Sequence, residues 1–231
     1  MSKRELVVGG IKIEVTKKKN MRNLRIRVRP PEGKVLVSVP AGTRDQEIRR
    51  FVEQKSDWIM EARARVLEME QRNRREYVSG EVYPLWGEPC VLQVVSGAGR
   101  SGVRLEGNQI IMTVPQGCDA GTRERTLLAW YRRQLREALA LTAEKCEEKT
   151  GLRAQEYRIK NMKTRWGTCN IEKRRIWISL QLAAKPAECL SYVVIHELTH
   201  LLERNHTRRF YGLLEGFCPD WRRAEELLKK S

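Results

Sequence analysis

The chain has 231 residues, of which 41% are hydrophobic and 32% are charged, and its formal net charge is +16. This balance is typical of a globular protein and excludes collagen, low-complexity disorder and a coiled coil over the whole chain. No run approaches the roughly 18–20 consecutive apolar residues that a membrane span requires, so we expect no membrane partner. Because the N-terminus does not have the pattern of a secretory signal, we expect a cytoplasmic protein.

The six cysteines lie at least 20 residues apart and form no CxxC pair. In a chain of this kind we expect reduced thiols, and the spacing argues against a zinc site built from cysteines.

The excess of basic residues indicates either an anionic binding partner or a contribution to solubility. Such a charge attracts nucleic acid, nucleotides or other anions, and residues 1–80 alone hold 20 basic and 11 acidic side chains. Aromatic residues are only 6% of the chain, which disfavours a base-stacking surface. Association with nucleic acid and simple solubility therefore both remain open.

In chain order, the first elements are a β-hairpin and a helix. Residues 24–28 and 35–39 alternate or are apolar, and a Pro-Pro-Glu-Gly turn separates them. Thr43 is expected to cap the following helix, with Gln46 as its capping-box partner. Strands at residues 91–95 and 110–114 repeat this plan before a second helix, which predicts two strand–strand–helix units.

A long helix is expected next, over residues 122–149, with Thr122 as its N-cap and Gly151 just after its end. Strands at residues 157–162 and 175–180 follow. Pro186 then opens a buried helix.

That last helix carries the motif His-Glu-x-x-His, at His196, Glu197 and His200. Residues four apart lie one turn above each other on one helix face, where two imidazoles can bind one tetrahedral Zn²⁺. Glu197 is then expected to take the proton of a metal-activated water and return it to the leaving group.

The chain has three histidines, and the third, His206, lies ten residues after the first. We expect His206 to be the third metal ligand. In the motif His-Glu-x-x-His-x-x-Gly-x-x-His a glycine forms the turn at the position that Glu203 occupies here. We therefore expect the turn at Asn205, because asparagine tolerates a left-handed backbone. The Glu203 carboxylate is an alternative ligand or an acceptor for an imidazole N–H.

Two further residues are candidates for substrate binding. Arg165 offers a fork for a carboxylate or a phosphate, or else forms a structural ion pair. Tyr211 could stabilise an oxyanion, or else is a half-buried packing residue. Cys169 could ligate a metal through its soft sulfur atom, but we expect a small buried hydrophobic residue at this position.

Three sequence blocks carry a family resemblance: RWGTC at 165–169, YVVIHELTH at 192–200 and NHTRRFYGLLEGFCPDWRRAEELL from Asn205. In this order they resemble the YgjP-like family of metal-dependent hydrolases, which is related to SprT-type zincin metallopeptidases. The resemblance implies an α+β fold in which residues 121–231 form a zincin-like catalytic domain and residues 1–120 a β-rich region. It also implies zinc held by all three histidines and Glu197 as the catalytic acid/base.

Three functions fit these features. The first is a zinc peptidase, in which the strand at residues 176–180 could offer an edge to an extended peptide. The second is a metal-dependent phosphohydrolase, such as a nucleoside triphosphate pyrophosphatase, because eight basic residues against two acidic ones precede the motif between residues 153 and 175. The third is a nucleic-acid-associated metalloprotein.

Overall fold

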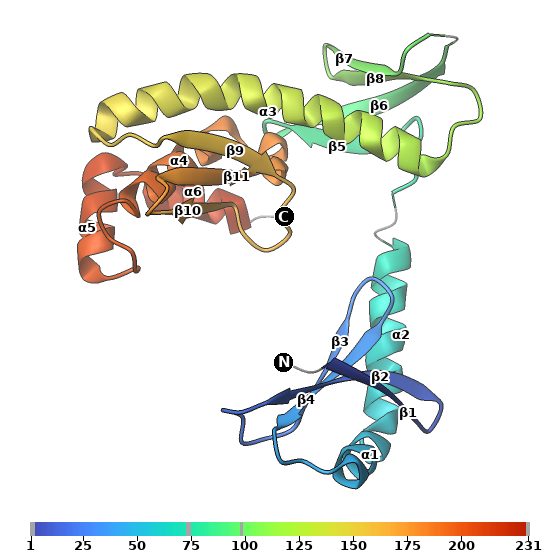
Figure 1. Ribbon diagram of the computed structural model, residues 1–231. Coiled ribbons are helices and arrows are strands. Elements are labelled where there is room, and N and C mark those ends of the chain that lie inside the picture. The colour runs from blue at the N-terminus through green and yellow to red at the C-terminus, as the bar shows by residue number, and fades with distance from the viewer. Residues whose placement is uncertain (1–2, 73–74, 98, 230–231) are drawn as a thin grey trace. The chain divides into compact units, whose positions relative to one another are not determined.

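The computed structural model describes residues 3–72, 75–97 and 99–229 (Figure 1). The chain folds into two compact units, Met1–Arg75 and Glu76–Ser231, called unit 1 and unit 2 below. The fold is mixed α+β, with three sheets and six α-helices among the described residues. None of the helices in this part of the chain combines the length and the apolar character of a membrane span.

Unit 1 is a four-stranded sheet with two helices. The strands occur in the order β1 (Lys3–Val8), β2 (Ile11–Lys18), β4 (Lys34–Pro40) and β3 (Arg25–Arg29). The inner strands β2 and β4 are parallel, and each outer strand is antiparallel to its neighbour. Alternate apolar residues of the strands pack with helices α1 (Asp45–Glu53) and α2 (Ser56–Arg72) in a core of their own.

The capping box of α1 lies one residue later than expected. Arg44 is the N-cap, and its backbone N–H donates to the Glu47 carboxylate at 3.1 Å. Thr43 is buried instead, where its carbonyl oxygen accepts a hydrogen bond from Lys17.

Unit 2 begins with a sheet of the same plan. Its strands occur in the order β5 (Val82–Leu85), β6 (Glu88–Ser96), β8 (Gln109–Val114) and β7 (Gly102–Glu106). Here too the inner strands are parallel and the outer ones antiparallel, and a helix follows the last strand in sequence. The two strand–strand–helix repeats expected from the sequence therefore have the same topology, but each of their sheets contains four strands rather than two.

The helix after this sheet, α3 (Ala120–Thr150), is the longest of the described helices. It ends as expected, with Gly151 in a left-handed conformation at φ 71°. It starts earlier than expected, because Asp119 is the N-cap and accepts from the Thr122 backbone N–H at 2.8 Å.

The rest of unit 2 is a three-stranded sheet and the helices that pack on it. The sheet order is β10 (Gly167–Asn170), β11 (Arg175–Ser179) and β9 (Glu156–Lys160), followed in sequence by the short 3-10 helix η1 (Leu180–Ala184) and by α4 (Ala187–Thr199), α5 (Arg208–Phe217) and α6 (Trp221–Lys229). The expectation that residues 176–180 offer a free edge is wrong, since β11 lies between two strands. The outer strands of this sheet are β10 and β9, and β10 contacts α4.

The boundary between the compact units falls at residue 75, whereas the sequence suggested a boundary at residue 120. The difference arises because the β5–β8 sheet shares one continuous apolar core with α3 and α4. The assignment of catalysis to residues 121–231 stays a prediction. All six cysteines are described, and none of them forms a disulfide.

Candidate metal centre

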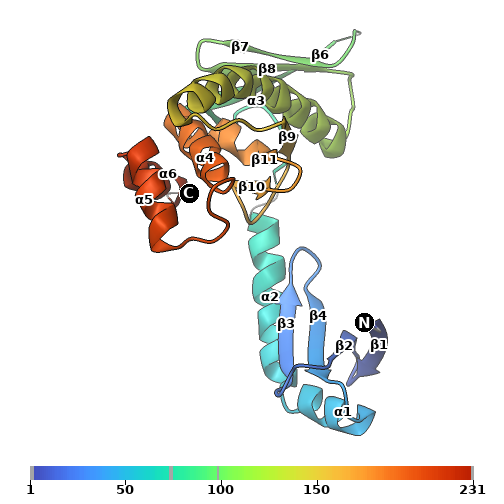
Figure 2. The same ribbon diagram turned by 60° about the vertical axis from the view of Figure 1, so that its left-hand side comes forward.

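Helix α4 supplies the first elements of the site. Leu190, Val194 and Leu198 are fully or almost fully buried in the core of unit 2. The helix packs against α3, α5, α6 and β10, as Figure 2 shows around its orange ribbon. Because α4 is held on several sides, the histidines on its remaining face have fixed positions.

The three histidines converge. One ring nitrogen from each of His196, His200 and His206 lies within 4.8 Å of the others, and the Nε2 atoms of His196 and His206 are 3.0 Å apart. Two nitrogen ligands of a tetrahedral ion, each about 2.0–2.1 Å from it, are about 3.3 Å apart. The arrangement therefore fits a divalent ion that prefers imidazole ligands.

The protonation state of His196 also fits. Burial, reinforced by the neighbouring histidines, lowers its pKa to about 3, so the ring is neutral at physiological pH. A neutral imidazole is the form that ligates a metal. Its Nδ1 is buried and has no hydrogen-bond partner among the described residues.

His200 is oriented by the backbone. Its Nδ1 lies 3.1 Å from the carbonyl oxygen of Glu203, and a donated N–H at this position leaves the lone pair of Nε2 for a metal. The acceptor role expected of the Glu203 carboxylate thus belongs to the main chain. That carboxylate lies 3.4 Å from the backbone nitrogen of Asn205 and is not among the converging groups.

The turn that returns His206 to the other rings differs from the expected one. Asn205 does not have a positive φ. Instead α4 tightens at its end, where Leu202 and Glu203 both donate their backbone N–H groups to the Thr199 carbonyl. Thr207 then caps α5, as the sequence predicted, by accepting from the Phe210 backbone N–H at 3.3 Å.

Phe210, on the first turn of α5, lies against all three histidines. Its ring centroid is 4.9 Å from that of His196 and 4.7 Å from those of His200 and His206. The side chain is fully buried. Sequence reasoning missed this role, because an apolar helix position looks the same whether it packs on leucines or on imidazoles.

Glu197 lies at the base of the site with only 5% of its surface exposed. Burial raises the pKa of its carboxyl group to about 8, against the opposing effect of the nearby Arg165 charge. A carboxyl group that titrates near neutral pH suits proton transfer in both directions.

The same carboxyl group packs against the β10 backbone at Gly167. A Cβ placed on Gly167 would lie 2.6 Å from Glu197 Oε1 and 2.7 Å from its Cγ. Only glycine, which has no Cβ, leaves room for the Glu197 carboxyl group at this position. The sequence singled out Gly167 as part of the RWGTC block, but only the fold brings it to Glu197.

A cleft of about 1120 Å³ extends from the histidines. Its walls include β10, the loop with Arg165, and Glu225, Leu228 and Lys229 of α6, whose part in the site the sequence did not indicate. Three basic and three acidic residues line these walls: Arg165, Arg204 and Lys229, and Glu172, Glu197 and Glu225.

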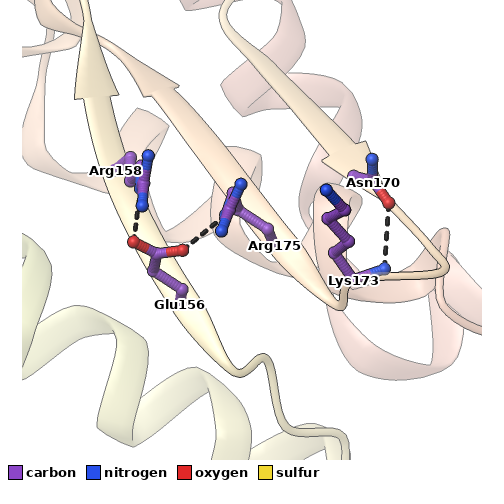
Figure 3. Close-up of polar contacts among 5 residues, drawn as sticks. All are labelled: Glu156, Arg158, Asn170, Lys173 and Arg175. Carbon is purple, nitrogen blue, oxygen red and sulfur yellow. Dashed lines mark hydrogen bonds and ion pairs between the residues drawn. The ribbon is translucent and has the colours of Figure 1, made fainter.

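Most of the basic residues counted before the motif lie outside the cleft. Of that set only Arg165 lines it. Figure 3 shows Arg158 and Arg175 both paired with Glu156 on the neighbouring strands, and the Lys173 backbone N–H donating to Asn170 Oδ1 at 2.9 Å. Seven of the eight basic side chains counted before the motif therefore do not line the cleft.

Tyr211 lies beside the centre but is not among the cleft residues. Its ring stacks on Trp221 at 5.5 Å and lies 6.2 Å from the His206 ring, and 42% of the residue is exposed. Substrate binding by Tyr211 and by Arg165 stays a prediction.

A family model described as YgjP-like, metallopeptidase domain, matches residues 22–231. The similar solved structures include the crystal structure of the metallopeptidase zymogen of Pyrococcus abyssi abylysin, which is 23% identical. That match covers 38% of this chain and 87% of the other, with a TM-score of 0.35. No curated protein matches the chain.

Proposed function

The chain belongs to the YgjP-like family of metallopeptidase domains, and from this premise we propose that it is a zinc-dependent peptidase whose general acid/base is Glu197. The observation that carries the proposal is the convergence of three imidazole nitrogens beside a buried carboxyl group in an open cleft. We propose zinc because three imidazoles and one open position are the donor set of many catalytic zinc sites. In fold, we propose that residues 121–231 are zincin-like.

Each histidine has a defined part in holding the ion. His196 and His200 project from one face at the end of α4, and His206 comes from the following turn. The Glu203 carbonyl fixes the His200 tautomer, and Phe210 supports all three rings. When bound, zinc supplies Lewis acidity and makes water acidic enough to react near neutral pH.

Glu197 performs the proton transfers. Its carboxylate accepts the proton of the attacking water and then donates it to the nitrogen of the leaving amine. Its contact with Gly167 limits the positions that the carboxyl group can take. In the peptide-free protein, burial keeps this group partly protonated, and a nearby divalent cation favours the charged form that the first step requires.

A peptide substrate suits the cleft because β10 is a free edge of its sheet and lines the wall. Trp166 O accepts a hydrogen bond from Ser179 N, so by antiparallel alternation the main-chain groups of Gly167 and Cys169 are directed away from β11. An extended peptide can bind these groups as an added strand.

A substrate panel tests the proposal. The full chain with zinc is incubated with unfolded proteins and mixed peptides in one arm, and with nucleoside triphosphates in the other. We expect peptide cleavage that a chelator abolishes and added zinc restores. Release of phosphate or pyrophosphate without peptide cleavage would replace the proposal with the phosphohydrolase alternative.

A further inference from the structure

Unit 1 contains a second concave site, far from α4 in sequence. It is a groove of about 820 Å³ over the end of β2, the loop that follows and the first part of β3, the blue segments of Figure 1. Residues on its walls are Lys17, Lys18, Lys19, Asn20, Met21, Arg22, Asn23, Arg25, Arg27, Ser38 and Ala41. Six of these side chains are basic and none is acidic, so the lining of the groove is positively charged.

Within the described part of unit 1, ion pairs do not neutralise the charge of the groove. Residues 17–29 contain seven basic residues and no acidic one. The ion pairs described within unit 1 involve Glu5, Glu14, Asp45 and Glu61, and none of these pairs includes a residue of the groove. Lys17 donates to the Thr43 carbonyl oxygen, and the other five basic side chains are exposed.

The basic side chains form a row because β3 alternates. Ile26 and Val28 pack on the core of unit 1, so Arg25, Arg27 and Arg29 stand on the opposite face and are exposed. Alternate residues of a strand are about 6.6 Å apart, which lets successive arginines contact different anionic groups of one polymer. Since β3 is an edge strand, a long ligand can run past the row without meeting another strand.

The groove also lacks a feature that single-strand binders use. None of its lining residues is aromatic, so it offers no platform on which bases could stack. The remaining polar groups, from Asn20, Asn23 and Ser38, are short donors that suit phosphate oxygens. Contacts of this kind position a nucleic acid without reading its sequence.

We propose that this groove binds the phosphodiester backbone of duplex nucleic acid without sequence preference. The inference concerns unit 1 alone and does not depend on the metal centre or on the proposed peptidase activity. A tether of this kind would keep the protein near nucleic acid or near proteins bound to it.

The test measures binding of the full-length protein to fluorescent duplex DNA, duplex RNA and unpaired strands over a range of salt concentrations. We expect either duplex to bind more tightly than the unpaired strands, with a steep loss of affinity as salt rises. The variant Arg25→Gln/Arg27→Gln should lower the slope of log affinity against log salt by about 2, since each lost phosphate contact lowers it by about 1.

The matched control is Arg50→Gln/Lys55→Gln, which removes the same charge from exposed positions on α1 and just after it. This control should keep the slope of the wild type, and circular dichroism verifies that both variants fold. Equal losses in the two variants would overturn the groove as the site. Binding to phosphatidylserine vesicles but not to duplexes, or tighter binding of unpaired strands, would overturn the proposed ligand.

Discussion

Gly167 lies directly against Glu197, so that a methyl group on the glycine would meet the carboxyl oxygen at 2.6 Å. The two residues are thirty positions apart in sequence and belong to β10 and α4. The contact joins the free edge of the sheet to the proposed acid/base. It explains in physical terms why the RWGTC block contains a glycine at this place.

The first prediction follows from this contact. Gly167→Ala should displace the Glu197 carboxyl group while leaving the histidines in place, because the three heavy atoms nearest to the added Cβ all belong to Glu197. A displacement of about 1 Å from the reactive position costs roughly a hundredfold in rate. We therefore expect peptide hydrolysis to fall by about this factor while the zinc content, measured by atomic emission, is unchanged.

Gly212→Ala provides the control for Gly167→Ala. Gly212 lies within α5, and a Cβ at this position meets nothing within 4 Å. Alanine there should leave the rate unchanged and raise helix stability slightly. If Gly167→Ala kept full activity, Gly167 would not constrain Glu197.

The second prediction separates the backbone of Glu203 from its side chain. Because His200 is oriented by the Glu203 carbonyl oxygen, Glu203→Ala should keep the zinc stoichiometry of the wild type. His206→Ala should lose the metal, since it removes one of three converging nitrogens. Metal analysis after dialysis measures both, and loss of zinc in Glu203→Ala would make that carboxylate a ligand.

The third prediction concerns pH and the metal-free protein. Burial raises the pKa of Glu197 from 4.5 to about 8, so the folded state holds a proton that the unfolded state releases above pH 4.5. This group therefore lowers stability progressively as the pH rises from 4.5 to 8, by on the order of 5 kcal/mol in total. Above pH 8 its effect is constant.

Urea unfolding of chelator-treated protein measures this effect. Glu197→Gln lacks the titrating group, so its stability advantage over the wild type should grow between pH 4.5 and 8 and then level off. Parallel stability curves over this range would show that Glu197 is not buried as described.

The sequence predicted the parts of the site that depend on helix geometry. The spacing of His196 and His200 fixes their common face, and Thr207 and Gly151 act as the helix caps that their residue types indicate. These features are local, so a few consecutive residues determine them.

The parts that sequence reasoning missed depend on tertiary packing. β10 is short and mostly polar, and its place at the edge follows from the pairing of β11 with β9. In the same way, neither the Phe210 support beneath the rings nor the α6 wall of the cleft has a local signature. The small contribution of these basic residues to the cleft also required the fold, because only Arg165 of the eight basic residues counted before the motif lines it.

The most direct test of the proposed mechanism compares two cleft variants, Glu197→Gln and Glu225→Gln, for zinc content and for peptide hydrolysis in the same preparations. Removing an acid/base group typically costs 10²–10⁴-fold in rate. We predict about one zinc per chain in both variants, as three histidine ligands require, with this loss of rate only in Glu197→Gln. A Glu197→Gln protein that binds zinc and cleaves peptides at the wild-type rate would contradict the mechanism.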